Sequence, residues 1–271
     1  PIWGAVMSGD EQAVPAKLAG HHVSIAYGMQ SIVEDLGLLV PERRFTALVG
    51  PNGSGKSTIL RTFAGLMAPS RGTILLDGRN IDKLPTKEMA KRIGVLLQGP
   101  VAPEGLTVRD LVRQGRYPHR AFFGRWSDED EAACEEALML TGTTILAGTP
   151  LDRLSGGQRQ RAWIAMTLAQ RGEVLLLDEP TTYLDLAHQI ELMNLITVLV
   201  RDHGKTVVAV LHDLNQAARY AEHIVLLKGG RISAAGRPDD VLSEEAIADV
   251  FGVRSVIIRD PVAGTPLCVP L

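Results

Sequence analysis

A glycine-rich loop with one lysine is the segment of this chain best suited to bind phosphate. It follows the apolar stretch Phe45–Val49 and precedes the helix-like stretch Ser57–Ala64, the strand–loop–helix context that the pattern G-x-x-x-x-G-K-[ST] requires. Glycines let backbone N–H groups wrap around phosphate oxygens, and the helix N-terminus adds positive dipole. Lys56 would reach the β- and γ-phosphates of a nucleotide, and the Ser57 hydroxyl would ligate Mg²⁺. The predicted phosphate-binding residues are Gly50, Pro51, Asn52, Gly53, Ser54, Gly55, Lys56, Ser57 and Thr58.

An Asp-Glu pair at the end of the apolar run Val174–Leu177 supplies carboxylates for hydrolysis. Asp178 would hold Mg²⁺, directly or through water, and Glu179 would polarise the attacking water as general base. Pro180 cannot continue the hydrogen bonding of the strand and turns the chain out of the sheet. One carboxylate at a strand end can simply mark where the strand meets solvent, but Asp-Glu-Pro after a fully apolar run favours catalysis.

Two further polar side chains follow apolar runs. Gln98 comes after Ile93–Leu97, and His212 comes after Val207–Leu211. Ligands of open parallel sheets collect at the carboxyl edge of the strands, so we expect Gln98 near Mg²⁺ or the attacking water, although a lone Gln is usually a surface residue. A His at a strand end is more often structural, and Asp213 suits the N-cap of a following helix.

A second glycine pair opens a helical stretch over Arg159–Gln170. Ser155 and Gln158 have the spacing of a capping box, which alone would make this a well-capped helix. The capping box does not explain Gly156 and Gly157, because glycine costs about 1 kcal/mol in a helix relative to alanine. Glycines in the first turn expose bare N–H groups, so we expect Ser155, Gly156, Gly157 and Gln158 to form an anion-binding site.

Taken in order, these motifs resemble those of ATP-binding cassette (ABC) ATPases, over a range from about Leu18 to the C-terminus. The segments Gly115–His119 and Leu211–Ala217 resemble the ATPases of bacterial iron–siderophore importers, and Asp260–Pro266 most resembles the ferric enterobactin branch. The resemblance implies an α/β fold: a P-loop NTPase core with an antiparallel β edge subdomain and an inserted helical lobe at about residues 99–165. It also implies one domain over residues 17–271.

The resemblance further implies roles and partners. His212 would contact the γ-phosphate, Asp185 would contact the opposite copy, and Tyr27 would stack on adenine, unless it is one more half-buried strand tyrosine. The expected assembly is a homodimer with ATP and Mg²⁺ between the phosphate loop of one copy and Ser155–Gln158 of the other. Integral-membrane permease subunits, and indirectly a substrate-binding protein, would place the chain at the cytoplasmic face of the membrane.

The composition of the chain narrows the kinds of partner and of cellular location that remain possible. The 271 residues are 45% hydrophobic and carry a net charge of −3, which suggests neither nucleic acid nor anionic membrane as a partner. Cys134 and Cys268 give no metal spacing and no disulfide framework. No apolar stretch approaches the roughly 20 residues that span a bilayer, Pro1–Val6 has no basic region of a secretory signal, and Pro1–Ala16 is expected to be disordered.

Several alternatives stay open. The cargo could be haem, vitamin B12 or another metal chelate. A soluble ABC ATPase acting on DNA or ribosomes would usually carry a longer insertion than Gln98–Ser155, and a non-hydrolysing regulator would not need Glu179. A basic–aromatic stretch could bind nucleic acid, form a solvated helix face or, as the resemblance implies, dock permease loops. Its members are Arg109, Arg113, Arg116, Tyr117, Arg120, Phe122, Phe123, Arg125 and Trp126.

Local patterns predict the other elements. A β-rich edge is expected over Leu18–Val40, and Asp77-Gly78 predicts a hairpin within Gly72–Ile81. Helices are expected over Thr107–Gln114 and Ser127–Leu140, which begin at capping residues. The C-terminal end is expected to contain a helix over Ser243–Phe251 and one terminal strand.

Overall fold

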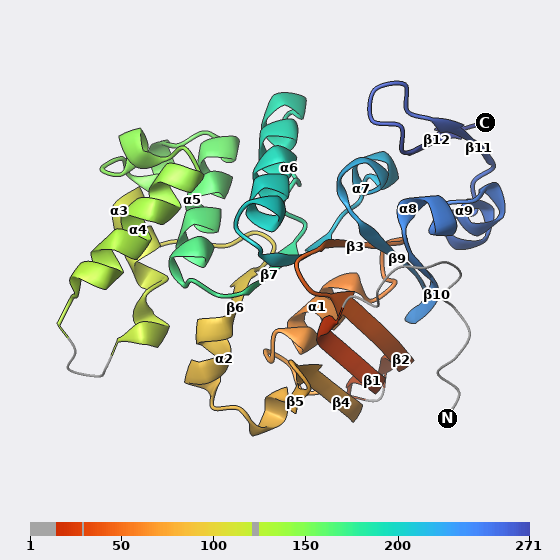
Figure 1. Cartoon of the computed structure of the whole chain (residues 1–271), viewed down its shortest axis with the longest axis horizontal. Helices are drawn as coiled ribbons and strands as arrows, with labels where there is room; N and C mark the ends of the chain where they lie inside the picture. Colours follow the sequence, from red (N-terminus) through yellow and green to blue (C-terminus); the bar gives the residue numbers. More distant parts are fainter. Residues whose placement is uncertain (1–14, 29, 121–124) are drawn as a thin grey trace.

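The computed structural model describes residues 15–28, 30–120 and 125–271. Within these residues the strands form three sheets (Figure 1). An antiparallel sheet has the order β2-β1-β4-β5, a central sheet has the order β10-β9-β3-β8-β7-β6, and β11 and β12 form a hairpin. The strands are β1 (Ala16–Tyr27), β2 (Gln30–Pro41), β3 (Phe45–Val49), β4 (Arg71–Leu76), β5 (Arg79–Asn80), β6 (Ile93–Leu96), β7 (Val174–Asp178), β8 (Thr206–Val210), β9 (His223–Lys228), β10 (Arg231–Gly236), β11 (Ser255–Arg259) and β12 (Pro266–Pro270).

The central sheet brings the candidate site to one edge. Strands β9, β3, β8, β7 and β6 are parallel, so their carboxyl ends lie together, and β10 joins antiparallel to β9. Strands β3, β7 and β8 are buried along their whole length, as expected for parallel strands covered on both faces. The α/β class and the sheet edge predicted from the apolar runs are therefore confirmed.

Two cores cover the two faces of this sheet. On one face, Leu176 and Val208 pack with helix α1 (Lys56–Phe63) and the antiparallel sheet. On the other face, Leu175 and Leu177 pack with the remaining helical core. The other helices are α2 (Thr86–Arg92), α3 (Val108–Gln114), α4 (Asp128–Leu140), α5 (Gly156–Ala169), α6 (Leu186–Arg201), α7 (Leu214–Tyr220), α8 (Pro238–Val241) and α9 (Glu244–Phe251). None of the helices in the described ranges is long and apolar enough to cross a membrane.

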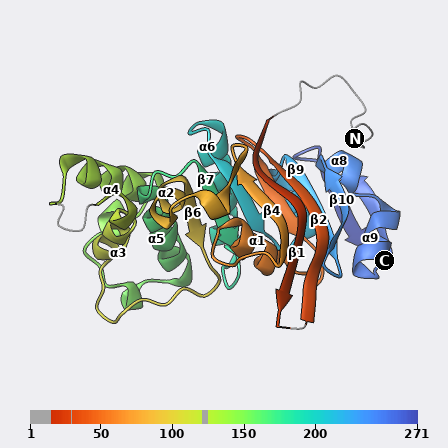
Figure 2. The same cartoon turned by 90° about the horizontal axis from the view of Figure 1, so that it is seen from below.

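Helices α3, α4 and α5 form a lobe beside the β6 edge, whereas α1 lies against the sheet centre (Figures 1 and 2). Thr107, Ser127 and Ser155 each close a capping box at the start of one of these helices, which explains where the helices begin. Helix α5 starts at Gly156, three residues before the predicted start, because the glycine pair is its first turn.

Arg116 forms a buried ion pair with Asp130 inside this lobe. The interpretation of Arg116 as part of a basic surface is therefore wrong. The Arg116 guanidinium is 1% exposed, donates to Asp130 at 2.8 Å and also donates to the Ala169 carbonyl at the end of α5. His119 donates to the neighbouring Gln170 carbonyl at 2.7 Å. The segment Gly115–His119 therefore caps the C-terminal end of α5. Phe122 and Phe123 lie outside the described residues.

The chain termini differ from expectation in two places. Strand β1 begins at Ala16, inside the range expected to be disordered, and the Pro15 carbonyl accepts a bond from Glu42. Residues 1–14 lie outside the described residues. At the other end, β11 and β12 pair where one terminal strand was expected. Asn215 of α7 anchors β12 by exchanging two hydrogen bonds with the Cys268 backbone.

Candidate nucleotide-hydrolysis site

The phosphate loop is shaped by close backbone contacts at its two ends. A Cβ at Gly50 would lie 2.2 Å from the Leu227 carbonyl of β9, so only glycine fits where β3 leaves the sheet. Gly55 has a φ of +94°, and its Cα faces Val33 of β2. Lys56 donates to the Gly50 and Pro51 carbonyls at 2.8 Å each, which folds its side chain back over the loop.

Lys56, Ser57 and Asp178 form a partly buried cluster. Burial lowers the pKa of Lys56, an effect that the charges of Glu179 and Asp178 oppose. The Ser57 hydroxyl donates to Asp178 Oδ1 at 2.7 Å, and burial raises the pKa of Asp178 despite this bond. Among the described residues, Asp178 Oδ2 has no hydrogen-bond partner, and Arg61 lies 3.9 Å from it. A buried carboxylate oxygen left unpaired beside a hydroxyl fits a hard cation such as Mg²⁺.

Glu179 is the meeting point of the predicted catalytic groups. Gln98 donates to its Oε2 at 2.5 Å, and His212 Nε2 lies 2.7 Å from its Oε1. Thr182 also donates to Oε2, at 3.1 Å. The backbone of Glu179 has a φ of +52°, a left-handed conformation that costs a non-glycine residue roughly 1 kcal/mol or more. The strained turn at Pro180 therefore aims this carboxylate along the sheet edge.

The segment Leu154–Gln158 differs from the phosphate loop in that its polar side chains bond to its own backbone. Gln158 N donates to Ser155 Oγ at 3.3 Å, and Ser155 N donates back to Gln158 Oε1 at 3.1 Å. Gly156 is exposed, with nothing nearer to a built Cβ than the Tyr183 carbonyl at 3.8 Å. Gly157 is buried, and a Cβ there would lie 2.3 Å from the His188 ring. Packing against this ring is therefore one reason for a glycine at position 157, and anion binding by the N–H groups of the pair stays a prediction.

Asp185 and Tyr27 are two further predicted site residues. Asp185 caps α6 by accepting from His188 N at 2.9 Å, and its Oδ1 lies 2.7 Å from His188 Nδ1. Tyr27 ends β1 and is 50% exposed. Its strand partner β2 carries Val33 against Gly55 of the phosphate loop. Adenine stacking by Tyr27 stays a prediction.

The match with known families covers the phosphate loop and the carboxylate pair together. The ABC transporter family profile matches residues 33–182. This chain belongs to the ABC transporter family. The ferric enterobactin transport ATP-binding protein FepC of Escherichia coli (strain K12) is 52% identical over 256 residues, 94% of each chain. The iron(3+)-hydroxamate import ATP-binding protein FhuC of Bacillus subtilis (strain 168) is 46% identical over 251 residues, 93% of each chain.

Solved structures agree with this assignment. The ATP-binding cassette MJ0796, in a dimeric post-hydrolysis structure bound to ADP and Pi, matches with a TM-score of 0.70 and 31% sequence identity over 81% of this chain.

 The aligned part is 98% of that cassette. The sheet, the phosphate loop and the carboxylate pair of this ABC ATPase are therefore those of an enzyme that binds and hydrolyses ATP.

The sequence patterns did not identify three residues that contact the predicted site of this ABC ATPase. Arg61 lies one helical turn after Ser57 on α1, so the i, i+4 spacing could have placed it near Asp178. Thr182 lies in the loop after Glu179, and its hydroxyl could have been expected to reach back to that carboxylate. His188 could not have been found, because its contact with Gly157 joins segments that are distant in sequence.

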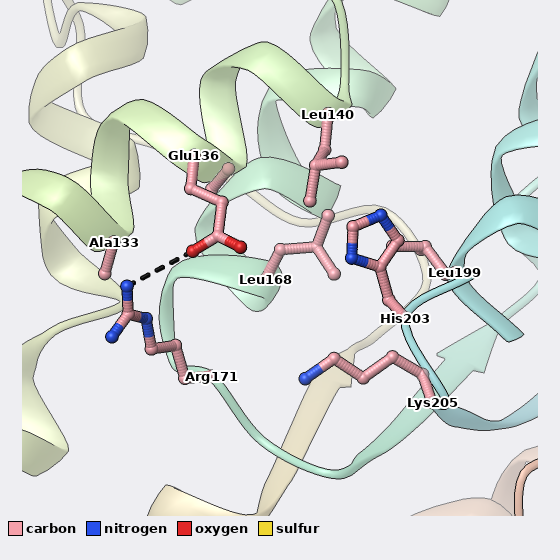
Figure 3. A pocket seen from close by; sticks show the side chains of 9 residues that line it. Ala133, Glu136, Leu140, Leu168, Arg171, Leu199, His203 and Lys205 are labelled. Atoms are coloured by element: carbon pink, nitrogen blue, oxygen red, sulfur yellow. Dashed lines mark hydrogen bonds and ion pairs between the residues drawn. The ribbon is translucent and has the colours of Figure 1, made fainter.

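The described part of this ABC ATPase has a small cavity that is unrelated to the nucleotide. It lies between α4, α5 and α6 and contains the ion pair of Glu136 with Arg171, at 3.2 Å, beside His203 and Lys205 (Figure 3). Its volume of about 40 Å³ is enough for a water molecule and far below what a nucleotide needs. Lys205 donates to the Gly172 carbonyl at 2.7 Å, and burial lowers its pKa.

Proposed function

We propose that this chain is the ATP-hydrolysing subunit of a bacterial importer of ferric siderophores, attached to permease subunits at the cytoplasmic face of the membrane. The observation that carries the proposal is the similarity, over more than nine-tenths of the chain, to ATP-binding proteins named for ferric enterobactin transport and iron(3+)-hydroxamate import. An ATPase subunit does not contact the cargo, so the cargo follows from this similarity and not from a pocket in the chain.

The chemistry follows from the groups around Glu179. Its carboxylate would accept a proton from the attacking water, while Gln98 and His212, which already contact its two oxygens, would orient it and the γ-phosphate. Lys56 would turn from the loop carbonyls to the phosphates. Ser57 and Asp178 would hold Mg²⁺, which supplies neutralisation of the phosphate charge when it is bound. The positions of these side chains support the roles.

Assembly follows from the separation of the two glycine-rich segments. The start of α5 lies in the helical lobe and α1 lies under the central sheet (Figures 1 and 2). A second copy would bring its Ser155–Gln158 segment to the phosphate loop of the first, so that ATP joins the two chains and its hydrolysis releases them. The dimeric solved structure of a related cassette supports this proposal.

The surface that would receive the permease is a groove on the helical lobe. It has a volume of about 430 Å³, and Arg113, Tyr117 and Trp126 are among its lining residues. The Arg113 guanidinium stacks on the Trp126 ring at 4.9 Å, and Tyr117 is 64% exposed. Arg109 and Arg113 are paired with Glu131, so this stretch is not a free basic surface of the kind that binds nucleic acid. A permease loop with apolar and acidic residues would fit the groove.

The test uses membrane vesicles that contain this chain together with the permease that it is proposed to serve. We expect ATP-dependent uptake of ferric enterobactin or another ferric siderophore, and no uptake when the chain carries Glu179→Gln. Haem and vitamin B12 serve as competing cargoes. Uptake of one of these in place of a ferric siderophore would contradict the proposed cargo, whereas no ATP-dependent uptake of any of these compounds, with the permease present, would contradict the transport role.

A further inference from the structure

The first turns of α6 contact both the segment that would serve the partner's nucleotide and the segment that serves the chain's own. Toward α5, the His188 ring packs on Gly157, and Glu191 accepts a bond from Arg161 at 2.9 Å. Toward α7, Gln189 Oε1 accepts a bond from Gln216 Nε2 at 2.6 Å. The same two turns thus join two parts of the site that are far apart along the chain.

His188 is held in one orientation. Its Nδ1 lies 2.7 Å from Asp185 Oδ1, its backbone N–H donates to the same oxygen, and its ring is packed on a glycine that has no room for a side chain. A ring fixed by a cap and by packing has one position available, so a movement of α6 has to move the first turn of α5 with it.

Gln189 and Gln216 form the other contact. Gln189 also donates to the Leu184 carbonyl at 3.0 Å, which ties it to the loop that follows Glu179. Gln216 lies in the first turn of α7, whose cap Asp213 directly follows His212. A displacement of His212 and its helix when phosphate leaves would therefore act directly on α6.

We propose that His188 and Gln189 are positioning residues that link the Ser155–Gln158 segment to His212 of the same chain, and so couple the two nucleotide sites of a dimer. The coupling rests on the proposed dimer, in which Ser155–Gln158 acts on the partner's nucleotide while His212 acts on the chain's own. Loss of phosphate at one site would then loosen the contact that the same chain makes with the other.

The Gly157–His188 contact is tested by rescue in the Glu179→Gln background, with ATP-driven dimerisation measured by analytical ultracentrifugation. We expect Gly157→Ala to weaken dimerisation because its Cβ meets the ring, and His188→Ala to restore part of it. Restoration would be partial because the Cβ of residue 188 still lies 3.0 Å away. Gly156→Ala is the matched control, since the contact of its built Cβ outside its own helix, among the described residues, is with the Tyr183 carbonyl at 3.8 Å, and His188→Ala should not rescue it.

The outcomes separate the inference from the assembly on which it rests. Rescue confined to Gly157→Ala supports the positioning role, and failure to rescue it while the Glu179→Gln parent dimerises overturns that role alone. A Glu179→Gln parent that stays monomeric with ATP overturns the dimer and the coupling together.

The Gln189–Gln216 contact is tested by a double-mutant cycle on kcat. Gln189→Ala and Gln216→Ala should each lower kcat about fivefold, the scale of one hydrogen bond, with unchanged ATP affinity in calorimetry. The double variant should lose no more than either single variant, because both remove the same bond. Asn194→Ala, an exposed amide on the same helix, is the control and should keep full kcat. Unchanged kcat in the single variants, or additive losses, would overturn the link.

Discussion

Two helix N-termini of this chain are glycine-rich, and their surroundings differ. At the start of α1, Lys56 and Ser57 lie beside Asp178, whose Oδ2 is buried with no hydrogen-bond partner among the described residues. At the start of α5, Ser155 and Gln158 satisfy each other in a capping box, and the first turn has no acidic residue. The first terminus therefore has a hydroxyl and a carboxylate beside it, whereas the side chains at the second terminus bond to each other's backbone N–H groups. This difference fits the proposed dimer, in which a second molecule would complete each site.

The largest effect should come from removing the carboxylate of Glu179, which follows β7 and whose charge acts on Lys56 at the first terminus. Glu179→Gln should lower kcat by about 10²–10⁴-fold, because a general base is lost while Gln98 and His212 keep a polar partner. ATP binding, measured by calorimetry, should remain. Near-normal turnover in this variant would remove Glu179 from the role of base and leave the first terminus as a binding site alone.

The next largest effect should be on ATP binding at the start of α1. Lys56→Ala should weaken ATP binding by roughly ten- to a hundredfold, the scale of a charge-assisted hydrogen bond to phosphate. Lys205→Ala is a comparable control, because Lys205 is half-buried and also donates to a backbone carbonyl, but lines the cavity of Figure 3. Equal ATP affinity in Lys56→Ala and wild type, measured by calorimetry, would contradict the phosphate-loop assignment.

Sequence patterns predicted the first terminus better than the second. The apolar runs and the residues after them placed Gln98, Glu179 and His212 together, because parallel strands end at one edge. The capping box at Ser155 was also predictable, since its two members are three residues apart. The reason for Gly157 was not, because the His188 ring comes from another helix.

Arg116 shows the same limit in the helical lobe. Its residue type and its basic neighbours suggested an exposed face, but its side chain is buried on Asp130. The sequence shows which side chains are able to form ion pairs, but it does not show which partner the fold will place beside each of them. Local spacing therefore predicted caps, strand ends and turns, and it failed where a contact joined different helices.

The second terminus is tested by mixing two inactive variants. Ser155→Arg places bulk and charge at the start of α5, so it should bind ATP but neither dimerise nor hydrolyse it. Mixed with Lys56→Ala, it should regain part of the activity, because one site of the heterodimer pairs an intact phosphate loop with an intact Ser155–Gln158 segment. If this segment served its own chain, every site would hold one lesion and ATPase assays of the mixture would show no recovery.

The smallest effect is expected at the opposite end of α5, where His119 donates to the Gln170 carbonyl. Burial of the ring, with the nearby Arg116 charge, holds the pKa of His119 below its usual 6.5, although the bond to Gln170 opposes this shift. Folding therefore favours the neutral ring, and the unfolded chain binds more protons as pH falls through 6.5. This residue should thus lower the free energy of unfolding on acidification and have no effect above about pH 7.5.

His119→Gln keeps an N–H donor but cannot be protonated in this range. Urea unfolding at pH 7.5 and pH 5.5 should therefore show a smaller acid-induced loss of stability in the variant than in the wild type, since the other titrating groups are common to both. ATP affinity at pH 7.5 should be equal in the two proteins, because the phosphate loop is untouched. An identical pH dependence of unfolding in the two proteins would show that His119 is not held neutral. A loss of ATP affinity in the variant would show that the C-terminal end of α5 and the phosphate loop are not independent.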